Sequence, residues 1–262
     1  MMRQISLLGC GWLGLPLAEA MIQKGFEVKG STTSHNKLSL LQATGINAYA
    51  INLSATVIEG EIAEFLDGSE ILVIDIPPKS KEGHFPDKMR MLLPYIEKAG
   101  IANIIFVSSV SVYGEETLIV TEETMPMPVT ESGKQLLEAE RILCDKFPQT
   151  TIIRFGGLIG GERHPVKHLA GKTGLDNPDA PVNLIHRDDC IGIILKTIEK
   201  DAWGRIFNGV APYHPSRKEY YTNRAEEYGL PAPMFRTNVS SSGKIISADK
   251  LMEKLDYSFR EI

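Results

Sequence analysis

The chain contains few cysteines and no long apolar run, and these two absences exclude several classes of protein. Its three cysteines, Cys10, Cys144 and Cys190, are scattered and lack the close spacing of metal ligands. Neither a disulfide framework nor a cysteine metal site is therefore expected. No segment approaches the roughly 18 consecutive apolar residues of a membrane-spanning helix. A strand-like segment already begins at Ile5, which leaves no room for a signal peptide, so we expect a cytoplasmic protein.

Clusters of positive charge are absent as well. The 262 residues carry a formal net charge of −5, and no group of lysines and arginines is interleaved with aromatic residues. We expect neither a nucleic acid nor a membrane as a partner, because both attract strongly basic surfaces. The expected partner is a small-molecule substrate, and the sequence leaves the oligomeric state open.

Strand-like and helix-like segments alternate through the first 155 residues. β-branched runs such as 104–107 stand between segments whose apolar residues follow helical spacing. The expected strands are 5–8, 26–29, 48–51, 71–76, 103–108 and 150–154, and the expected helices are 15–24, 36–43, 59–66, 87–99 and 131–147. This alternation predicts an α/β fold with a doubly wound parallel Rossmann sheet covered by helices on both faces.

The turn after the first expected strand reads Gly9-Cys10-Gly11-Trp12-Leu13-Gly14, a G-x-G-x-x-G that opens a helix. In a dinucleotide site Gly9 permits the tight turn, Gly11 lets the diphosphate approach, and Gly14 lets helix and strand pack closely. The exposed N–H groups at the start of the helix would face the phosphates, so Trp12 and Leu13 also count as cofactor-binding residues. A tight turn that binds nothing is the alternative, but the order of strand, loop and helix favours an NAD(P) site.

The composition changes near Phe155. A glycine-rich stretch, 156–161, opens a region with scattered prolines and shorter elements. We interpret 1–155 as an NAD(P)-binding Rossmann domain and 156–262 as mainly a smaller C-terminal substrate lobe. Within the second part, 182–210 is expected to return to the sheet through a helix over 190–200. The lobe would complete a cleft over the carboxyl edge of the sheet.

The residues after the second expected strand favour NADP over NAD. NAD enzymes usually carry Asp or Glu about 20 residues beyond the glycine motif, and the stretch 30–34 contains no acid. Ser31, Thr32 and Thr33 offer hydroxyl donors, and Lys37 offers a positive charge for a 2′-phosphate. The alternative is a polar loop whose last hydroxyl caps the following helix.

Three further motifs stand in register with the glycine loop. They are SSVSVYG at 108–114, NLIHRDD at 183–189 and GRIFNG at 204–209. With them the chain resembles the extended short-chain dehydrogenase/reductases over nearly its whole length. It is most similar to their branch of NAD-dependent epimerases and dehydratases. The resemblance implies an oxidoreductase or epimerase that uses a nicotinamide dinucleotide and acts on a small hydroxylated substrate, such as a nucleotide sugar.

In that family a serine, a tyrosine and a lysine carry out the chemistry, with the last two spaced Y-x-x-x-K. The resemblance places the serine at Ser109 and the lysine at Lys134, where it would also hold the nicotinamide ribose. The tyrosine position is then Thr130, whose hydroxyl lacks the acidity of a phenol and better suits a helix N-cap. Losing a positioned acid or base typically costs about 10²–10⁴-fold in rate. Tyr113 is the first candidate to replace it, and the other candidates are His84, Glu131 and His186.

The resemblance adds further contacts. Asn52-Leu53 stands where relatives place an acid beside the adenine, and Ile76-Pro77 follows the fourth strand, where the family's backbone passes the cofactor. Asp75 is either functional or a turn residue before the prolines. Arg154 and Arg163 flank the glycine-rich stretch, where they would hold an anionic substrate group or form surface ion pairs.

No metal is expected to take part. His164 and His168 have helical i, i+4 spacing and Glu162 lies nearby. No third ligand with convincing spacing follows the two histidines, so an ordinary polar loop is the better interpretation.

Two functions are consistent with these residues. The first is an NAD(P)-dependent oxidoreductase or epimerase in which Thr130 replaces the usual tyrosine. The alternative is a non-catalytic NAD(P)-binding sensor or regulatory protein, because cofactor binding does not require the tyrosine.

Overall fold

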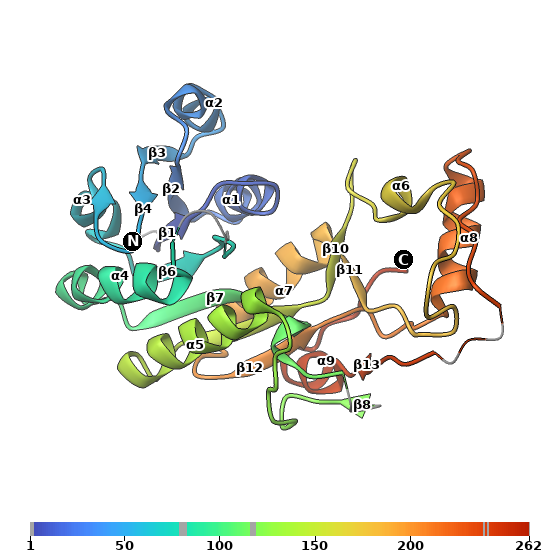
Figure 1. Cartoon of the computed structure of the whole chain (residues 1–262). Coiled ribbons are helices and arrows are strands. Elements are labelled where there is room, and N and C mark those ends of the chain that lie inside the picture. The colour runs from blue at the N-terminus through green and yellow to red at the C-terminus, as the bar shows by residue number, and fades with distance from the viewer. Residues whose placement is uncertain (1–2, 79–82, 116–118, 238, 240, 262) are drawn as a thin grey trace.

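A seven-stranded parallel sheet forms the larger part of the molecule (Figure 1). The computed structural model describes residues 3–78, 83–115, 119–237, 239 and 241–261. Across the sheet the strands follow the order β12 (Ile206–Gly209), β9 (Thr151–Phe155), β7 (Asn103–Ser109), β6 (Ile71–Ile74), β1 (Gln4–Leu8), β2 (Glu27–Thr32) and β3 (Asn47–Ala50). All neighbouring pairs in this sheet are parallel, so the predicted α/β Rossmann fold is confirmed.

The strands bury alternate residues on the two faces of the sheet, as the two-residue period of a strand requires. In β1, Leu7 packs into the core on one face and Leu8 into the core on the other, and Ile105 and Phe106 of β7 divide in the same way. Helices α1 (Gly14–Gln23), α2 (Leu38–Ala43), α7 (Arg187–Glu199) and α9 (Asp249–Leu255) cover the first face, and α3 (Ile62–Leu66), α4 (Phe85–Ala99) and α5 (Glu131–Lys146) cover the second. Among the described helices, none is long and apolar enough to cross a membrane.

The third helix is shorter than its sequence pattern predicts. It was expected over 59–66, but it begins at Ile62. Gly60 has a φ of 97°, which takes the chain out of the helical region. The residues just before it form β5 (Ile58–Glu59), which pairs antiparallel with β4 (Asn52–Leu53).

The helix expected over 190–200 begins earlier, at Arg187. His186 is its N-cap, and the ring Nδ1 accepts a hydrogen bond of 3.2 Å from the amide of Asp188. Acidic side chains at Asp188 and Asp189 then lie in the first turn, where they complement the helix dipole. Arg187 is therefore fixed at the first helical position.

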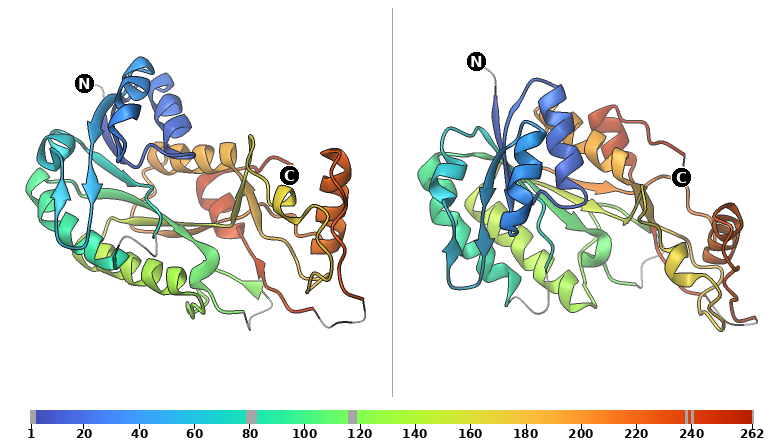
Figure 2. Two further views of the ribbon diagram at one scale, coloured as in Figure 1. Left: turned by 45° about the horizontal axis from the view of Figure 1, so that its top comes forward. Right: turned by 90° about the horizontal axis from the view of Figure 1, so that it is seen from above.

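A smaller lobe projects from one end of the sheet domain (Figure 2). It contains β10 (Gly157–Ile159) and β11 (Leu184–His186), which pair in parallel, together with α6 (Val166–Leu169) and α8 (Arg217–Glu227). Ile159, Val166, Leu184, Tyr220 and Ala225 are buried in a separate small core. Two short strands, β8 (Ile119–Val120) and β13 (Ile245–Ile246), pair with each other outside these sheets.

The strand order reverses between β1 and β6. From β1 the chain moves outward through β2 and β3 on one side, and from β6 it moves through β7, β9 and β12 on the other. Open parallel sheets bind ligands at the carboxyl ends of their strands at such a point. The loops that leave β1, β2, β6 and β7 therefore define where a functional site is expected.

Candidate functional site

A pocket of about 490 Å³ lies where these loops meet. Its wall contains most of the residues that the sequence predicted for the cofactor, namely Gly9, Gly11, Trp12, Leu13, Ser31, Thr32, Thr33, Lys37, Asn52, Leu53, Ile76 and Pro77. Asp75, Lys88, Ser109, Leu136, Leu158 and Arg163 also line it. The pocket thus joins the carboxyl edge of the sheet to the beginning of the C-terminal lobe.

The glycine loop after β1 is tightly folded at both ends and open in the middle. Gly9 has a φ of 112°, and a Cβ atom at Gly14 would lie 2.0 Å from the carbonyl oxygen of Gly9. At Gly11, no described residue other than its two chain neighbours has a heavy atom within 4 Å of a Cβ position. Within the described residues, the amides of Trp12 and Leu13 have no hydrogen-bond acceptor. The loop therefore fits a diphosphate, since free amides and open space lie together at the start of α1.

The hydroxyl groups after β2 are not equally free to bind a ligand. Ser31 is buried, and its Oγ accepts a hydrogen bond of 3.0 Å from the amide of Gly9. Thr32 Oγ1 accepts a bond of 3.2 Å from the amide of Ser34. Thr33 and Lys37 are exposed and line the pocket, so they are the polar groups here that a ligand can contact.

Asp75 lies beneath the glycine loop, directly after β6. Its carboxyl accepts a hydrogen bond from the amide of Gly14, which would otherwise be one of the unsatisfied amides at the start of α1. Burial of this carboxyl raises its pKa to about 8. The hydrogen bond from Gly14 acts in the opposite direction, because it stabilises the charged form, but its effect is smaller. Asp75 is therefore mostly neutral at pH 7, and a neutral acid would not repel an anion in the glycine loop.

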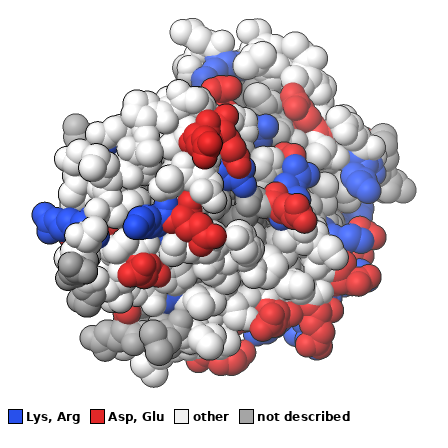
Figure 3. Space-filling view, turned by 90° about the vertical axis from the view of Figure 1, so that its right-hand side faces the viewer, with Lys and Arg blue, Asp and Glu red and all other residues white. Residues whose placement is uncertain are grey.

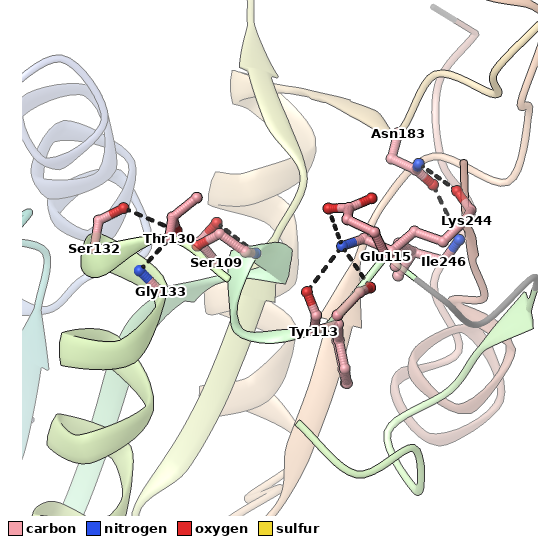
Figure 4. Close-up of polar contacts among 11 residues, drawn as sticks. Ser109, Tyr113, Glu115, Thr130, Ser132, Gly133, Asn183, Lys244 and Ile246 are labelled. Atoms are coloured by element: carbon pink, nitrogen blue, oxygen red, sulfur yellow. Dashed lines mark hydrogen bonds and ion pairs between the residues drawn. The ribbon is translucent and has the colours of Figure 1, made fainter. Parts of the chain in front are cut away.

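Ser109 and Thr130 lie near each other in the close-up but play different local roles (Figure 4). Ser109 lines the pocket at the end of β7, and its Oγ accepts a hydrogen bond of 3.1 Å from the amide of Ser111. Thr130 is the N-cap of α5, because its Oγ1 accepts a bond of 3.1 Å from the amide of Gly133. The N-cap interpretation of Thr130 is confirmed, and its hydroxyl is engaged in that cap.

Helix α5 turns Leu136, not Lys134, toward the pocket. Leu136 belongs to the pocket wall, whereas Lys134 is exposed and is not one of the lining residues. Residues two apart on an α-helix point about 200° apart, so the two side chains leave α5 on opposite sides. The lysine that does line the pocket is Lys88, a buried residue of α4.

Tyr113 is enclosed in a polar network behind Ser109. Its hydroxyl donates to Asn208 Oδ1 at 2.8 Å and accepts from the guanidinium of Arg154 at 2.8 Å. Arg154 makes a two-pronged contact with Glu140 at 3.1 and 2.6 Å, and Ser108 Oγ donates to the same carboxylate. Burial raises the pKa of Tyr113, and only 1% of the residue is exposed. Neither Tyr113 nor Arg154 is placed to touch a ligand in the pocket.

Lys244 connects the C-terminal part of the chain to the segment that follows Ser109 (Figure 4). Its ammonium donates to the carbonyl oxygens of Tyr113 and Gly114 at 2.9 and 3.0 Å and to Glu115 Oε1 at 2.9 Å. The backbone at Lys244 is itself held, because its carbonyl accepts a bond of 2.7 Å from Asn183. One lysine thus fixes the path of the chain beyond the pocket serine.

Two charged residues escaped the sequence analysis, Lys88 in the pocket wall and Arg187, which stacks on the pocket residue Trp12. Lys88 lies on the buried face of α4, three residues after Phe85 and four residues before Leu92. A lysine at this spacing among apolar residues is a signal that the sequence already contains. Arg187 lies within the motif 183–189 but gave no signal of its own. Its guanidinium stacks on Trp12, a contact that no local pattern predicts.

The residues considered for a metal have other roles. His164 is buried, its Nε2 lies 3.1 Å from the hydroxyl of Tyr220, and its Nδ1 accepts from the amide of Val166. Burial lowers the pKa of His164 to about 4. No group of three or more histidine, cysteine or acidic residues among those described could hold a metal ion.

Comparison with known proteins identifies a relative by sequence along almost the whole chain. No protein-family model matches the chain. Protein YeeZ of Escherichia coli K12 is 34% identical over an alignment of 266 residues, which covers 99% of this chain and 96% of that protein.

Solved structures of lower identity share the fold over the whole chain. UDP-glucuronic acid 4-epimerase from Bacillus cereus, in complex with NAD, is 18% identical with a TM-score of 0.80, and 99% of this chain and 94% of that one are covered. A short-chain dehydrogenase/reductase superfamily protein from Agrobacterium tumefaciens with bound NAD is 17% identical with a TM-score of 0.79, covering 99% and 93%. The chain therefore has the fold of these epimerases and of the short-chain dehydrogenase/reductase superfamily.

Proposed function

The chain belongs to the family of the Escherichia coli protein YeeZ, and from its fold and pocket we propose that it is an NAD(P)-binding oxidoreductase or epimerase. The glycine loop carries this proposal, because the open space at Gly11 and the unbonded amides of Trp12 and Leu13 suit a diphosphate. A bound nicotinamide would exchange a hydride with a substrate carbon. The substrate is a small hydroxylated molecule, and nucleotide sugars are the first class to test.

NADP is the preferred cofactor in this proposal. Thr33 and Lys37 are exposed at the pocket wall, and no acid stands between Gly30 and Ser34 to repel a 2′-phosphate. A lysine near a phosphate forms charge-assisted hydrogen bonds, which are about twice as strong as neutral ones. Asn52 donates to Glu59 at 2.9 Å and lines the same end of the pocket, where an adenine would lie.

Ser109 orients the substrate in this proposal, and the ammonium group comes from α4. Ser109 is the pocket hydroxyl at the end of β7, where its Oγ keeps a hydrogen available for a carbonyl or hydroxyl oxygen. Lys88 takes over the role that the resemblance gave to Lys134, because Lys88 is one of the residues that line the pocket and Lys134 is not. Proton transfer is not assigned to Tyr113, whose hydroxyl is bonded on both sides inside the core.

Cys10 is a pocket residue but not a nucleophile in this proposal. Burial, reinforced by the nearby Asp75, raises the pKa of its thiol to about 12, so the reactive thiolate is scarce at neutral pH. Cys10, Cys144 and Cys190 are all free thiols. Free thiols suit a reducing compartment, and we place the protein in the cytoplasm.

A non-catalytic NAD(P) sensor is the second candidate, and one specific observation favours it. Two of the family's three catalytic positions lack the usual group in the pocket, since the Thr130 hydroxyl caps a helix and Lys134 is not among the lining residues. The glycine loop is unaffected by either change. Binding would then persist without turnover.

Titration with NADPH and NADH, followed by a turnover screen with nucleotide sugars and simple carbonyl compounds, tests both candidates. We expect both cofactors to bind, NADPH more tightly, and a substrate that oxidises or reduces the bound cofactor. Binding without turnover would favour the sensor. Failure of both cofactors to bind at physiological concentrations would exclude both candidates.

A pair of lysine variants tests the assignment of the pocket ammonium. Lys88→Met is expected to lower turnover or cofactor affinity at least about tenfold, the usual scale for a lost charge-assisted contact. Lys134→Met is the matched control on the exposed side of α5 and should behave as the wild type. The reverse result would return the ribose-binding role to Lys134.

A further inference from the structure

Two arginine side chains stack on the indole ring of Trp12. The guanidinium carbon of Arg163 lies 4.9 Å from the ring centroid, and that of Arg187 lies 5.2 Å from it. Trp12 belongs to the glycine loop, whereas Arg163 follows β10 and Arg187 begins α7. The three residues come from distant parts of the sequence, so the fold brings two cations to the loop that suits a diphosphate.

Neither guanidinium forms an ion pair with a described carboxylate. The acids beside them in sequence are bound elsewhere, Glu162 to Lys167 and Asp188 to Arg260. The Nε of Arg187 is buried and has no hydrogen-bond partner among the described residues. Stacking on an indole uses the face of a guanidinium and leaves its in-plane N–H donors available. Both arginines therefore have donors to offer to an anion.

Arg163 lies in the pocket wall, and Arg187 lies beside the turn that carries Arg163. Arg163 lines the pocket with Trp12, and it closes a tight turn in which Gly160 and Arg163 exchange backbone hydrogen bonds of 3.0 and 3.1 Å. The terminal nitrogens of Arg187 lie 3.9 Å from a Cβ position at Gly161 in the same turn. On the face that carries α6 and α8, basic and acidic side chains are interspersed (Figure 3). The side chains visible on that face therefore do not form a continuous basic patch.

We propose that Arg163 and Arg187 form a phosphate-binding site against Trp12. The inference rests on the proposed function, because it uses the same pocket, and it narrows the ligand to one that carries a phosphate or diphosphate group. A guanidinium offers paired N–H donors whose spacing matches two oxygens of a phosphate. The phosphate belongs either to the substrate or to the cofactor diphosphate, which share this chemistry.

The fluorescence of Trp12 provides a direct test. The chain has two tryptophans, so Trp203→Phe leaves Trp12 as the reporter. In this background, inorganic pyrophosphate added to the protein without cofactor, at about 0.15 M salt, should change the Trp12 emission and reach saturation. Arg163→Gln and Arg187→Gln should each raise the Kd at least about tenfold, the scale of one charge-assisted contact. Arg217→Gln is the matched control, because Arg217 stacks on Phe235 at 5.9 Å and does not line the pocket.

Two further ligands identify the source of the phosphate. A cofactor phosphate is indicated if Arg163→Gln weakens NADPH binding as much as pyrophosphate binding. A substrate phosphate is indicated if NADPH affinity is unchanged and UDP binding to the NADPH-loaded protein is weakened. Both results support the site. Unchanged Trp12 emission at millimolar pyrophosphate, or wild-type affinity in both arginine variants, overturns it.

The pyrophosphate measurement separates this inference from the proposed function. It uses no nicotinamide, so saturable binding that depends on the arginines supports the site even where NADPH fails to bind. That combination would refute the proposed function alone. Normal NADPH binding with no response to pyrophosphate or UDP would refute the arginine site alone.

Discussion

Replacing Gly11 with alanine is expected to weaken dinucleotide binding while leaving the fold intact. No described residue other than its two chain neighbours has a heavy atom within 4 Å of a Cβ position at Gly11, and Gly11 does not have a positive φ. Apart from its two neighbours in the chain, the methyl group therefore meets no described residue. Alanine also restricts the unfolded chain, which stabilises a protein by up to about 1 kcal/mol at a compatible site. The free energy of unfolding should be unchanged or slightly higher.

The same methyl group would enter the space beside the amides of Trp12 and Leu13. An amide bonds a phosphate oxygen at about 2.9 Å, whereas a carbon atom is in contact at about 3.5 Å and must keep that distance. The phosphate would have to move away, at the loss of at least one hydrogen bond to a charged group. Such a bond contributes about 1.5–3 kcal/mol, which corresponds to a rise in Kd of about 10- to 150-fold.

NADPH fluorescence titration and thermal denaturation of the same samples measure the two effects separately. Gly14→Ala is the contrasting variant, because its Cβ would lie 2.0 Å from the carbonyl oxygen of Gly9, and its Tm should fall. Wild-type NADPH affinity in Gly11→Ala would refute the placement of the diphosphate at this loop. A Tm loss in Gly11→Ala equal to that of Gly14→Ala would refute the claim that the space is free.

Three other variants test the surroundings of the pocket. Arg154→Met leaves Glu140 buried without its ion pair. Urea denaturation should then show the free energy of unfolding lowered by about 3–5 kcal/mol. A loss below about 1 kcal/mol would contradict the buried pairing. Thr130→Ala removes the hydrogen bond from the Gly133 amide and should lower the free energy of unfolding by about 1 kcal/mol. NADPH affinity should not change. A lower affinity would mean that Thr130 touches the ligand. NADPH affinity should decrease as pH rises through about 8, because the Asp75 carboxyl is neutral below its pKa and negative above it. Asp75→Asn should flatten this profile between pH 6 and 9, and a profile that keeps its slope would exclude Asp75 as the cause.

The sheet and the glycine loop could be predicted because their signals are local. A continuous apolar run, such as the one that contains Ile104 and Ile105, predicts a strand buried on both faces, and the spacing of Gly9, Gly11 and Gly14 predicts a turn. Most predicted cofactor residues accordingly lie in one pocket wall. Residues close in sequence at the end of a strand remain close in space, and this does not depend on how the rest of the chain packs.

The chemistry at the other end of the pocket could not be predicted in this way. Tyr113 is a plausible acid by sequence, but its hydroxyl is bound by Asn208, which is 95 residues away, and by Arg154, which is 41 residues away. The orientation of Lys134 depends on which face of α5 packs on the sheet, and a family spacing of Y-x-x-x-K does not determine that rotation. Such contacts depend on tertiary packing and leave no periodic signal.

The contact between Lys244 and the carbonyls of Tyr113 and Gly114 has a consequence for synthesis of the protein. The lysine follows Tyr113 by 131 residues. At typical translation rates of about 5–20 residues per second, roughly 7 to 26 s pass between the addition of the two residues. During this interval β1, α1 and the glycine loop have already been made, while the segment beyond Ser109 lacks the cation that fixes its path. On the ribosome, the glycine-loop end of the pocket is therefore ready to form before the end that contains Ser109.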